Sequence, residues 1–186
     1  MIDVNQLRRN TAFLHDGNLY KVTEYSHNKT GRGKATIRVT VRNMRTGSIV
    51  QLTFNSSDRV EDVRLEKRTY QYSYDDGRFY VFMDTETYDQ KEVAYYTFDD
   101  HKQYLRENME IDLLTYEGEV LDYELPKSME FDVVESENAV AGDTATGATK
   151  EIITDTGLKV KTPLFVKEGD RIKVNTDTGE YITRVN

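Results

Sequence analysis

The residues with the clearest capacity for chemistry form a short glycine-containing stretch, Lys29-Thr30-Gly31-Arg32-Gly33-Lys34. Arg32 stands between two glycines, which adopt positive φ angles freely and carry no side chain to block a partner. Its guanidinium presents a planar fork of donors that matches phosphate oxygens and base edges. The spacing is not that of a phosphate-binding P-loop. The stretch predicts a projecting hairpin tip that contacts nucleic acid, although basic tips also occur on ordinary solvated hairpins.

The titratable side chains form no catalytic or metal-binding pattern. His15, His27 and His101 lack the spacing of metal ligands. The carboxylate pairs Asp75-Asp76 and Asp99-Asp100 are better explained as turn and cap residues. Cysteine is absent, and no nucleophile elbow or dinucleotide fingerprint is found. We therefore expect a protein that is not an enzyme and that uses no metal and no cofactor.

Basic residues continue beyond the tip along a predicted strand. The segment Arg38–Arg42 alternates, so its two arginines are expected on one face and its two valines on the core side. Seven basic residues lie between Lys21 and Arg45, opposed only by Glu24. This concentration favours a phosphate-contacting surface.

Net charge divides the chain into three blocks, with boundaries near Arg64 and Pro126. Residues 1–64 carry a net charge of +5, residues 65–126 carry −10, and residues 127–186 carry −3. A basic block within a chain of net charge −8 points to a nucleic-acid contact at one end. The acidic middle block suits contact with basic protein better than contact with RNA.

The rest of the pattern is that of short β-strands. The chain has 13 Tyr and 7 Phe, and the alternation in Thr69–Tyr74 places three tyrosines on one strand face. Turn signals that predict hairpins occur at Asp75-Asp76-Gly77, Glu117-Gly118 and Thr176-Asp177-Thr178-Gly179. We expect an all-β chain of small barrels, with domains at 1–64, 65–126 and 127–186.

One helix is predicted within this β pattern. Asp99 or Asp100 is suited to cap a helix that runs to about Asn108. Its inward-facing residues would be Tyr104 and Leu105.

Targeting and membrane signals are absent from the sequence. No apolar run approaches the roughly 20 residues that a membrane-spanning helix needs, and Met1–Asn5 lacks the features of a secretory signal. We expect a cytoplasmic protein that does not contact membranes.

Several segments resemble bacterial translation elongation factor P, and the resemblance covers the whole chain. His27–Ala35 is similar to the family's loop H-x-K-P-G-K-G-x-A. Segments similar to the family's third domain are Gly142-Asp143-Thr144-Ala145, Gly157–Val166, Gly169–Ile172 and Gly179–Val185. The resemblance implies an N-terminal KOW/SH3-like barrel followed by two OB-fold barrels in a bent, tRNA-like arrangement. The third domain indicates the bacterial branch, because archaeal and eukaryotic relatives have two.

The resemblance also implies a function and its partners. A monomeric factor would bind the 70S ribosome between the P and E sites and contact P-site peptidyl-tRNA. It would also contact ribosomal RNA and ribosomal proteins near the E site. It would stimulate peptide bond formation, which ribosomal RNA catalyses, and relieve stalling at consecutive prolines. Beyond the tip, the expected RNA-binding residues are Arg38, Arg42, Arg45, Gly142, Asp143, Thr144, Tyr181 and Arg184.

The tip departs from the family's usual sequence. Thr30 stands in place of proline, and Arg32 in place of a lysine that carries a lysyl-type or related modification. Family members with an arginine tip attach rhamnose to it, but asparagine usually follows there, whereas Gly33 follows here. Arg32 is the candidate modification site, and we expect it to be unmodified.

Three alternatives remain open at this level. A paralogue within the family would share all of these features. A generic OB-type RNA-binding protein would display stacking aromatics on a basic face, whereas Tyr70, Tyr72 and Tyr74 lie in the acidic block. A tyrosine-rich sugar-binding protein would explain the aromatics but not the Gly-Arg-Gly tip.

Overall fold

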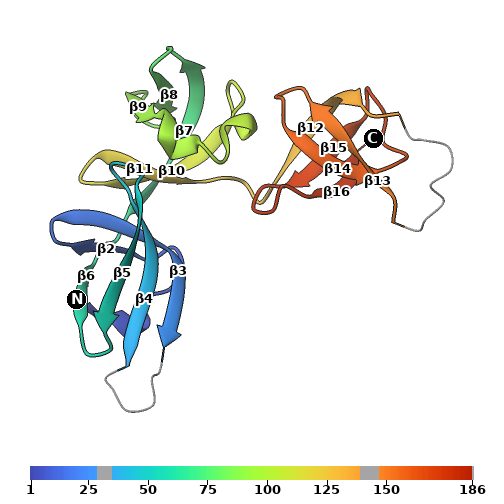
Figure 1. Ribbon diagram of the computed structural model, residues 1–186. Helices are drawn as coiled ribbons and strands as arrows, with labels where there is room; N and C mark the ends of the chain where they lie inside the picture. The colour runs from blue at the N-terminus through green and yellow to red at the C-terminus, as the bar shows by residue number, and fades with distance from the viewer. Residues whose placement is uncertain (29–34, 139–146, 186) are drawn as a thin grey trace. The chain divides into compact units, whose positions relative to one another are not determined.

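The computed structural model describes residues 1–28, 35–138 and 147–185, and these form three β-sheets (Figure 1). Apart from strands, the described residues contain only short 3-10 turns, at Val4–Gln6 (η1), Tyr95–Phe98 (η2) and Lys102–Tyr104 (η3). The all-β prediction is confirmed. No helix in these ranges has the length and apolar character needed to cross a membrane.

The first sheet has six strands in the order β1-β6-β2-β3-β4-β5. Its strands are β1 Ile2–Asp3, β2 Ala12–His15, β3 Asn18–Asn28, β4 Thr36–Asn43, β5 Ile49–Asn55 and β6 Arg59–Asp62. Along β4, Val39 and Val41 are fully buried while Arg38 is exposed, which confirms the predicted alternation. The valines join Phe13 and Phe54 in the core of this barrel.

The other two sheets share one topology. The second sheet has the order β11-β10-β7-β8-β9 and the third has the order β14-β13-β12-β15-β16. Their strands are β7 Glu66–Asp75, β8 Phe79–Asp84, β9 Gln90–Ala94, β10 Glu110–Tyr116, β11 Glu119–Glu124, β12 Ser128–Ser136, β13 Thr149–Thr154, β14 Lys159–Pro163, β15 Arg171–Asn175 and β16 Tyr181–Val185. In each, the first strand is central, with the second and third on one side and the fourth and fifth on the other. This is the strand order of a five-stranded OB barrel.

The three predicted hairpins are present. The turn between β10 and β11 has positive φ at both central residues, Glu117 (50°) and Gly118 (80°), as a type I′ turn requires. In the turn before β8, the Asp76 carboxylate accepts the backbone N–H groups of Phe79 and Arg78, which lowers the pKa of Asp76. The positions of these turns could therefore be predicted from the local sequence.

The predicted three-tyrosine face is wrong. The pairing of β7 with β8 shifts between Tyr72 and Tyr74, so a bulge interrupts the alternation. Tyr70 and Tyr72 are buried in the core, whereas Tyr74 is 47% exposed.

The predicted helix from Asp99 or Asp100 to Asn108 is also wrong. Asp99 instead ends η2, and His101 precedes η3 without forming a side-chain cap hydrogen bond. Leu105 is already extended, with ψ 129°. Tyr104 does face inward, where its ring packs edge-on against Phe131 with centroids 5.7 Å apart. Contacts with sequence-distant residues therefore replace the helical continuation, whose nucleation is costly in so short a segment.

Contacts divide the chain into two compact units, one formed by Met1–Arg68 with Leu113–Asp122 and the other by Thr69–Asp112 with Tyr123–Asn186. In the first unit, Leu121 is buried in a cluster with Ala12, Leu19 and Met44. In the second unit, the Arg106 guanidinium lies 4.7 Å from the Phe131 ring centroid and 2.8 Å from the Asp155 carboxylate.

One tyrosine of the second unit has a strongly shifted pKa. The Tyr95 hydroxyl donates a hydrogen bond to the Asp75 carboxylate, which raises the pKa of Tyr95 to about 12. Because the folded pKa is raised, this bond stabilises the protein below pH 10, and its contribution is lost as the pH rises through 12.

We expect Asp75→Asn to lower the pKa of Tyr95 towards its usual value near 10. The measurement is a ¹³C NMR titration of the tyrosine Cζ resonances, with Tyr95→Phe assigning the signal. Asp76→Asn is the control for charge alone, because Asp76 raises the pKa of Tyr95 without a hydrogen bond to it, and it should lower that pKa less than Asp75→Asn does. A Tyr95 signal that is unchanged in Asp75→Asn would contradict the bond.

Candidate nucleic-acid interface

The candidate interface lies on the long hairpin β3–β4 of the first sheet. Its antiparallel register places Ser26 opposite Arg38 and Glu24 opposite Thr40. The strands lead into the predicted tip. The tip residues Lys29, Thr30, Gly31, Arg32, Gly33 and Lys34, like Gly142, Asp143 and Thr144 of the third block, lie outside the described residues.

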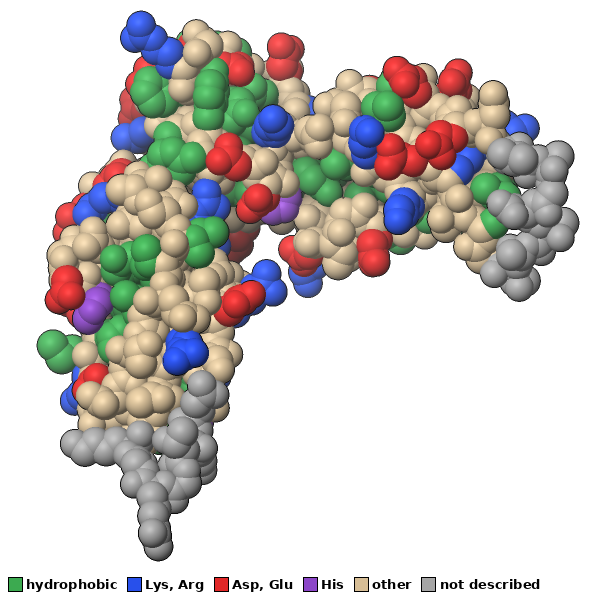
Figure 2. Space-filling model, viewed as in Figure 1, with side chains coloured by type: hydrophobic (Ala, Val, Ile, Leu, Met, Phe, Trp, Pro, Cys, Tyr) green, Lys and Arg blue, Asp and Glu red, His purple; other side chains and the backbone are tan. Residues whose placement is uncertain are grey.

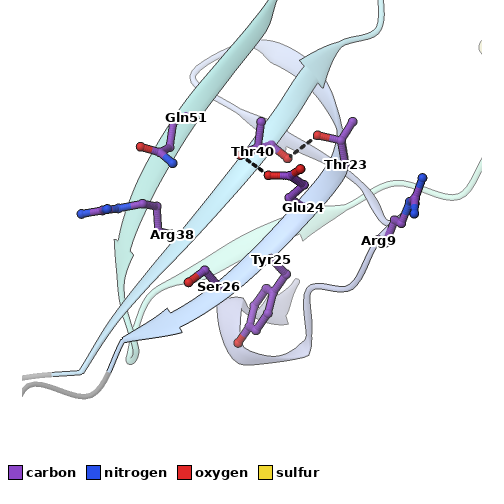
Figure 3. Close-up of a pocket in the computed structure, with 8 residues that line it drawn as sticks. All are labelled: Arg9, Thr23, Glu24, Tyr25, Ser26, Arg38, Thr40 and Gln51. Atoms are coloured by element: carbon purple, nitrogen blue, oxygen red, sulfur yellow. Dashed lines mark hydrogen bonds between the residues drawn. The ribbon is translucent and has the colours of Figure 1, made fainter. Parts of the chain in front are cut away.

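A hollow of about 520 Å³ opens on this face of the sheet. Its lining residues are Arg9, Thr23, Glu24, Tyr25, Ser26, Arg38, Thr40 and Gln51 (Figure 3). The Thr23 hydroxyl donates to the Thr40 carbonyl at 3.0 Å, and the Thr40 hydroxyl donates to the Glu24 carboxylate at 3.5 Å. These bonds hold the floor of the hollow.

Two arginines flank the hollow on opposite sides, Arg9 and Arg38 (Figure 3). Both are exposed, and within the described ranges neither forms an ion pair. The nearby Arg8 differs, because its guanidinium lies 5.3 Å from the Tyr25 ring centroid and donates to the carbonyls of Asn5 and Leu7. Arg9 and Arg38 are therefore the arginines of this face that are placed to contact an external anion.

The three arginines that the sequence assigned to one RNA-binding surface, Arg38, Arg42 and Arg45, have different environments in the structure. Arg45 donates from Nε to the Glu119 carboxylate at 3.2 Å. Arg42 is half-buried and lies opposite Lys21, which itself pairs with Asp122. Arg38 remains the most accessible of the predicted strand cations.

Arg9 and Gln51 line the hollow without having been predicted. Arg9 follows another arginine in the segment between η1 and β2, and this pair of arginines was a weak signal in the sequence. Gln51 had no signal, because its place follows from the β4–β5 register, where it lies opposite Thr40.

Two residues predicted to bind RNA, Tyr181 and Arg184, lie on β16 and have different environments. Tyr181 is half-buried and packs against the core of the third barrel. Arg184 is exposed, with its guanidinium 5.2 Å from the Phe165 ring centroid and 3.6 Å from the Asp170 carboxylate. Cations and carboxylates are interspersed across the visible surface (Figure 2), so no broad single-sign field marks this view.

No set of three or more His, Asp or Glu side chains in the described ranges is arranged to hold a metal ion. The hollow is lined by guanidinium, hydroxyl, amide and aromatic groups and by one carboxylate, that of Glu24. Such groups recognise phosphates and bases by hydrogen bonding and stacking.

Sequence-family comparisons agree with the sheet topologies. Residues 3–60 match the KOW-like domain of elongation factor P, residues 65–123 match its OB domain, and residues 129–184 match its C-terminal domain. A solved structure titled eukaryotic translation initiation factor 5A from Methanococcus jannaschii shares the fold. Its TM-score is 0.50 at 20% identity, over 66% of this chain and 94% of that chain. The three family matches, together with the sheet topologies, define a translation factor built from a KOW-like barrel and OB barrels.

Closer relatives narrow this class to one family. The chain is 43% identical to elongation factor P of Moorella thermoacetica over 184 residues, which are 99% of this chain and all of the relative. It is 41% identical to elongation factor P of a Synechocystis species over 186 residues, the full length of both. The chain belongs to the elongation factor P family of translation elongation factors.

Proposed function

We propose that this chain binds the 70S ribosome between the P and E sites and contacts P-site peptidyl-tRNA through its first domain. In doing so it stimulates peptide bond formation and relieves stalling at consecutive prolines. The observation that carries the proposal is the pair of exposed arginines that flank the hollow, Arg38 on the β3–β4 hairpin that leads into the tip and Arg9 on the segment before β2, neither of which forms an ion pair among the described residues. Guanidinium contacts with phosphates fix the register of a protein on RNA.

The factor acts by positioning and contributes no catalytic group of its own. Holding a reactant in a productive geometry lowers a barrier without chemical participation by the protein. A tip residue directed at the end of the tRNA would restrict unproductive arrangements of a poor nucleophile such as proline. The work takes place in the cytoplasm, with the factor acting as a monomer.

We propose that the domains, 1–64, 65–126 and 127–186, divide this work. The first block, with net charge +5, contacts tRNA, and the middle block, with net charge −10, contacts basic ribosomal protein. The third block contacts RNA near the E site through Gly142, Asp143 and Thr144, assisted by Tyr181 and Arg184. Arg42 and Arg45 supply further positive charge to the tRNA-contacting surface of the first block.

The experiment that tests the RNA-facing surface is the salt dependence of ribosome binding. Each phosphate contact releases counterions and adds about one unit to the slope of log K against log salt. We expect Arg9→Ala/Arg38→Ala to reduce this slope by about one to two units on ribosomes with an occupied P site. Binding is measured by sedimentation across a series of salt concentrations.

The matched control removes two exposed cations of the acidic block, in Arg78→Ala/Lys102→Ala. Its slope should equal that of the parent. A slope that survives loss of Arg9 and Arg38, or that falls in the control, would place the RNA-facing surface elsewhere.

A further inference from the structure

One turn with the same backbone hydrogen bonds occurs in each of the three sheets. It connects β4 to β5, β8 to β9 and β15 to β16. The side chain of its first residue, which is Asn43, Asp84 or Asn175, accepts the backbone N–H groups two and three positions later. The carbonyl of that residue accepts the N–H at the fifth position, at 2.8 Å in two copies and at 2.9 Å in the Asp84 turn. The three turns therefore share one backbone conformation.

The fifth position distinguishes the turn of the second barrel from the other two. It has a positive φ in every copy, 76° at Gly47, 74° at Gly179 and 64° at Tyr88. Glycine adopts this conformation freely, whereas a bulky side chain is strained there. No other aromatic residue in the described ranges has a positive φ. Tyr88 therefore carries backbone strain at a position where this chain twice uses glycine.

The Tyr88 side chain does little for the fold that would offset this strain. It is 71% exposed. Among the residues that the structure describes, its hydroxyl has no hydrogen-bond partner and its ring has no aromatic or cation–π partner. Backbone strain of this kind is concentrated at functional sites, where it persists because the strained residue is needed. The turn therefore indicates that the Tyr88 ring serves a contact outside the chain.

The charges around Tyr88 favour a cationic partner. Glu86 and Asp89, in the same turn, are both exposed, and the chain has no Lys or Arg between Arg78 and Lys91. The Asp89 carboxylate forms no ion pair or hydrogen bond within the described ranges. Carboxylates repel an RNA phosphate and attract a guanidinium. A tyrosine ring also attracts a guanidinium over its face, and Tyr and Arg are both enriched among the residues that dominate protein interfaces.

We propose that Tyr88 is the anchor through which the second barrel binds a basic protein surface. An arginine of the partner lies over the Tyr88 ring, and its guanidinium pairs with the Asp89 carboxylate. The inference rests on the proposed function, in which the middle block contacts basic ribosomal protein. It adds the residue that makes this contact and the side chain that the residue recognises.

The first test identifies the partner by photocrosslinking. The photoreactive amino acid benzoylphenylalanine replaces Tyr88 in the full chain, which is then bound to 70S ribosomes with an occupied P site. Mass spectrometry should identify a crosslinked ribosomal-protein peptide that contains arginine. The same replacement of Tyr74 is the control, because Tyr74 is a 47% exposed tyrosine of the same barrel without a positive φ, and it should not label this peptide. A crosslink to RNA, a crosslink to a peptide without basic residues, or no crosslink would overturn the proposal.

The second test separates recognition from folding. Tyr88→Gly removes the ring and the strain together, so it should bind these ribosomes about tenfold more weakly. It should melt at the parent's temperature or up to about 4 °C above it. Tyr88→Phe keeps the ring and should bind within about twofold of the parent, and Tyr74→Ala is the matched control that should bind as the parent does. Parental binding by Tyr88→Gly, equal weakening by Tyr74→Ala, or a melting temperature of Tyr88→Gly below the parent's would overturn the role of Tyr88.

Failure of this anchor is distinguishable from failure of the proposed function. If Arg9→Ala/Arg38→Ala keeps the parental salt slope on ribosomes, the tRNA-contacting surface of the first domain fails, while a crosslink from position 88 to a basic protein stands. If Tyr88→Gly binds ribosomes as the parent does, the anchor fails and the proposed function is retained.

Discussion

Arg32→Ala should remain folded and lose most of the relief of stalling at consecutive prolines, with a rate of proline–proline bond formation reduced by about 100-fold. Arg32 is flanked by glycines, where no packing contribution is expected, so its loss should not affect stability. The hairpin β3–β4 leads directly into this segment. In the proposed function this guanidinium positions the tRNA end, and a small misplacement of a reactant has a large effect on rate.

A reconstituted translation assay on a template with consecutive prolines provides the measurement. Arg64→Ala is the matched control, because Arg64 is an exposed arginine of the same block outside the hairpin. Arg32→Lys restores the residue that the family usually carries and should retain part of the activity. Equal relief by Arg32→Ala and the parent would show that the tip is not the acting group.

The same experiment requires the chemical state of the native tip to be known. We expect protein purified from its own host to show the unmodified mass at Arg32. A mass increase localised to that residue would show that a modified side chain acts there, and the comparison with alanine would then measure the modified group.

Leu121→Ala should lower the free energy of unfolding of the first compact unit by about 2–5 kcal/mol. Leu121 is 6% exposed and packs against Ala12, Leu19 and Met44, although it lies in β11. Its neighbour Asp122 pairs with Lys21. Shortening Leu121 leaves a cavity between the β10–β11 hairpin and the first sheet. The surrounding side chains close this cavity only partly.

Native-state hydrogen exchange reads this effect locally, which suits a chain of several domains. Amides of β2 and β3 should exchange faster in Leu121→Ala. Val120→Ala is the control, because Val120 is only half-buried, and it should cost under about 1 kcal/mol. Unchanged protection in β2 and β3 would mean that the packing of Leu121 does not stabilise the first sheet.

Local sequence determined much of the architecture. The alternation of Val39 and Val41 with polar residues identified the core face of β4, because side chains in a strand alternate with period two. Glycines such as Gly118 identified hairpins, because a glycine adopts the positive φ that a tight turn requires at little cost. Motifs spread over the whole chain were sufficient to predict the family, and the similarity to named relatives confirms that prediction.

Only the tertiary structure decided the features that depend on pairing between distant segments. The bulge between Tyr72 and Tyr74 breaks the predicted tyrosine face, and contacts of Tyr104 with the third sheet replace the predicted helix. Arg9 and Arg38 come to flank one hollow because segments far apart in the chain fold together, and Gln51 joins them through the β4–β5 register. Register is set by the packing of whole strands and not by any one segment, so no local pattern in the sequence contains it.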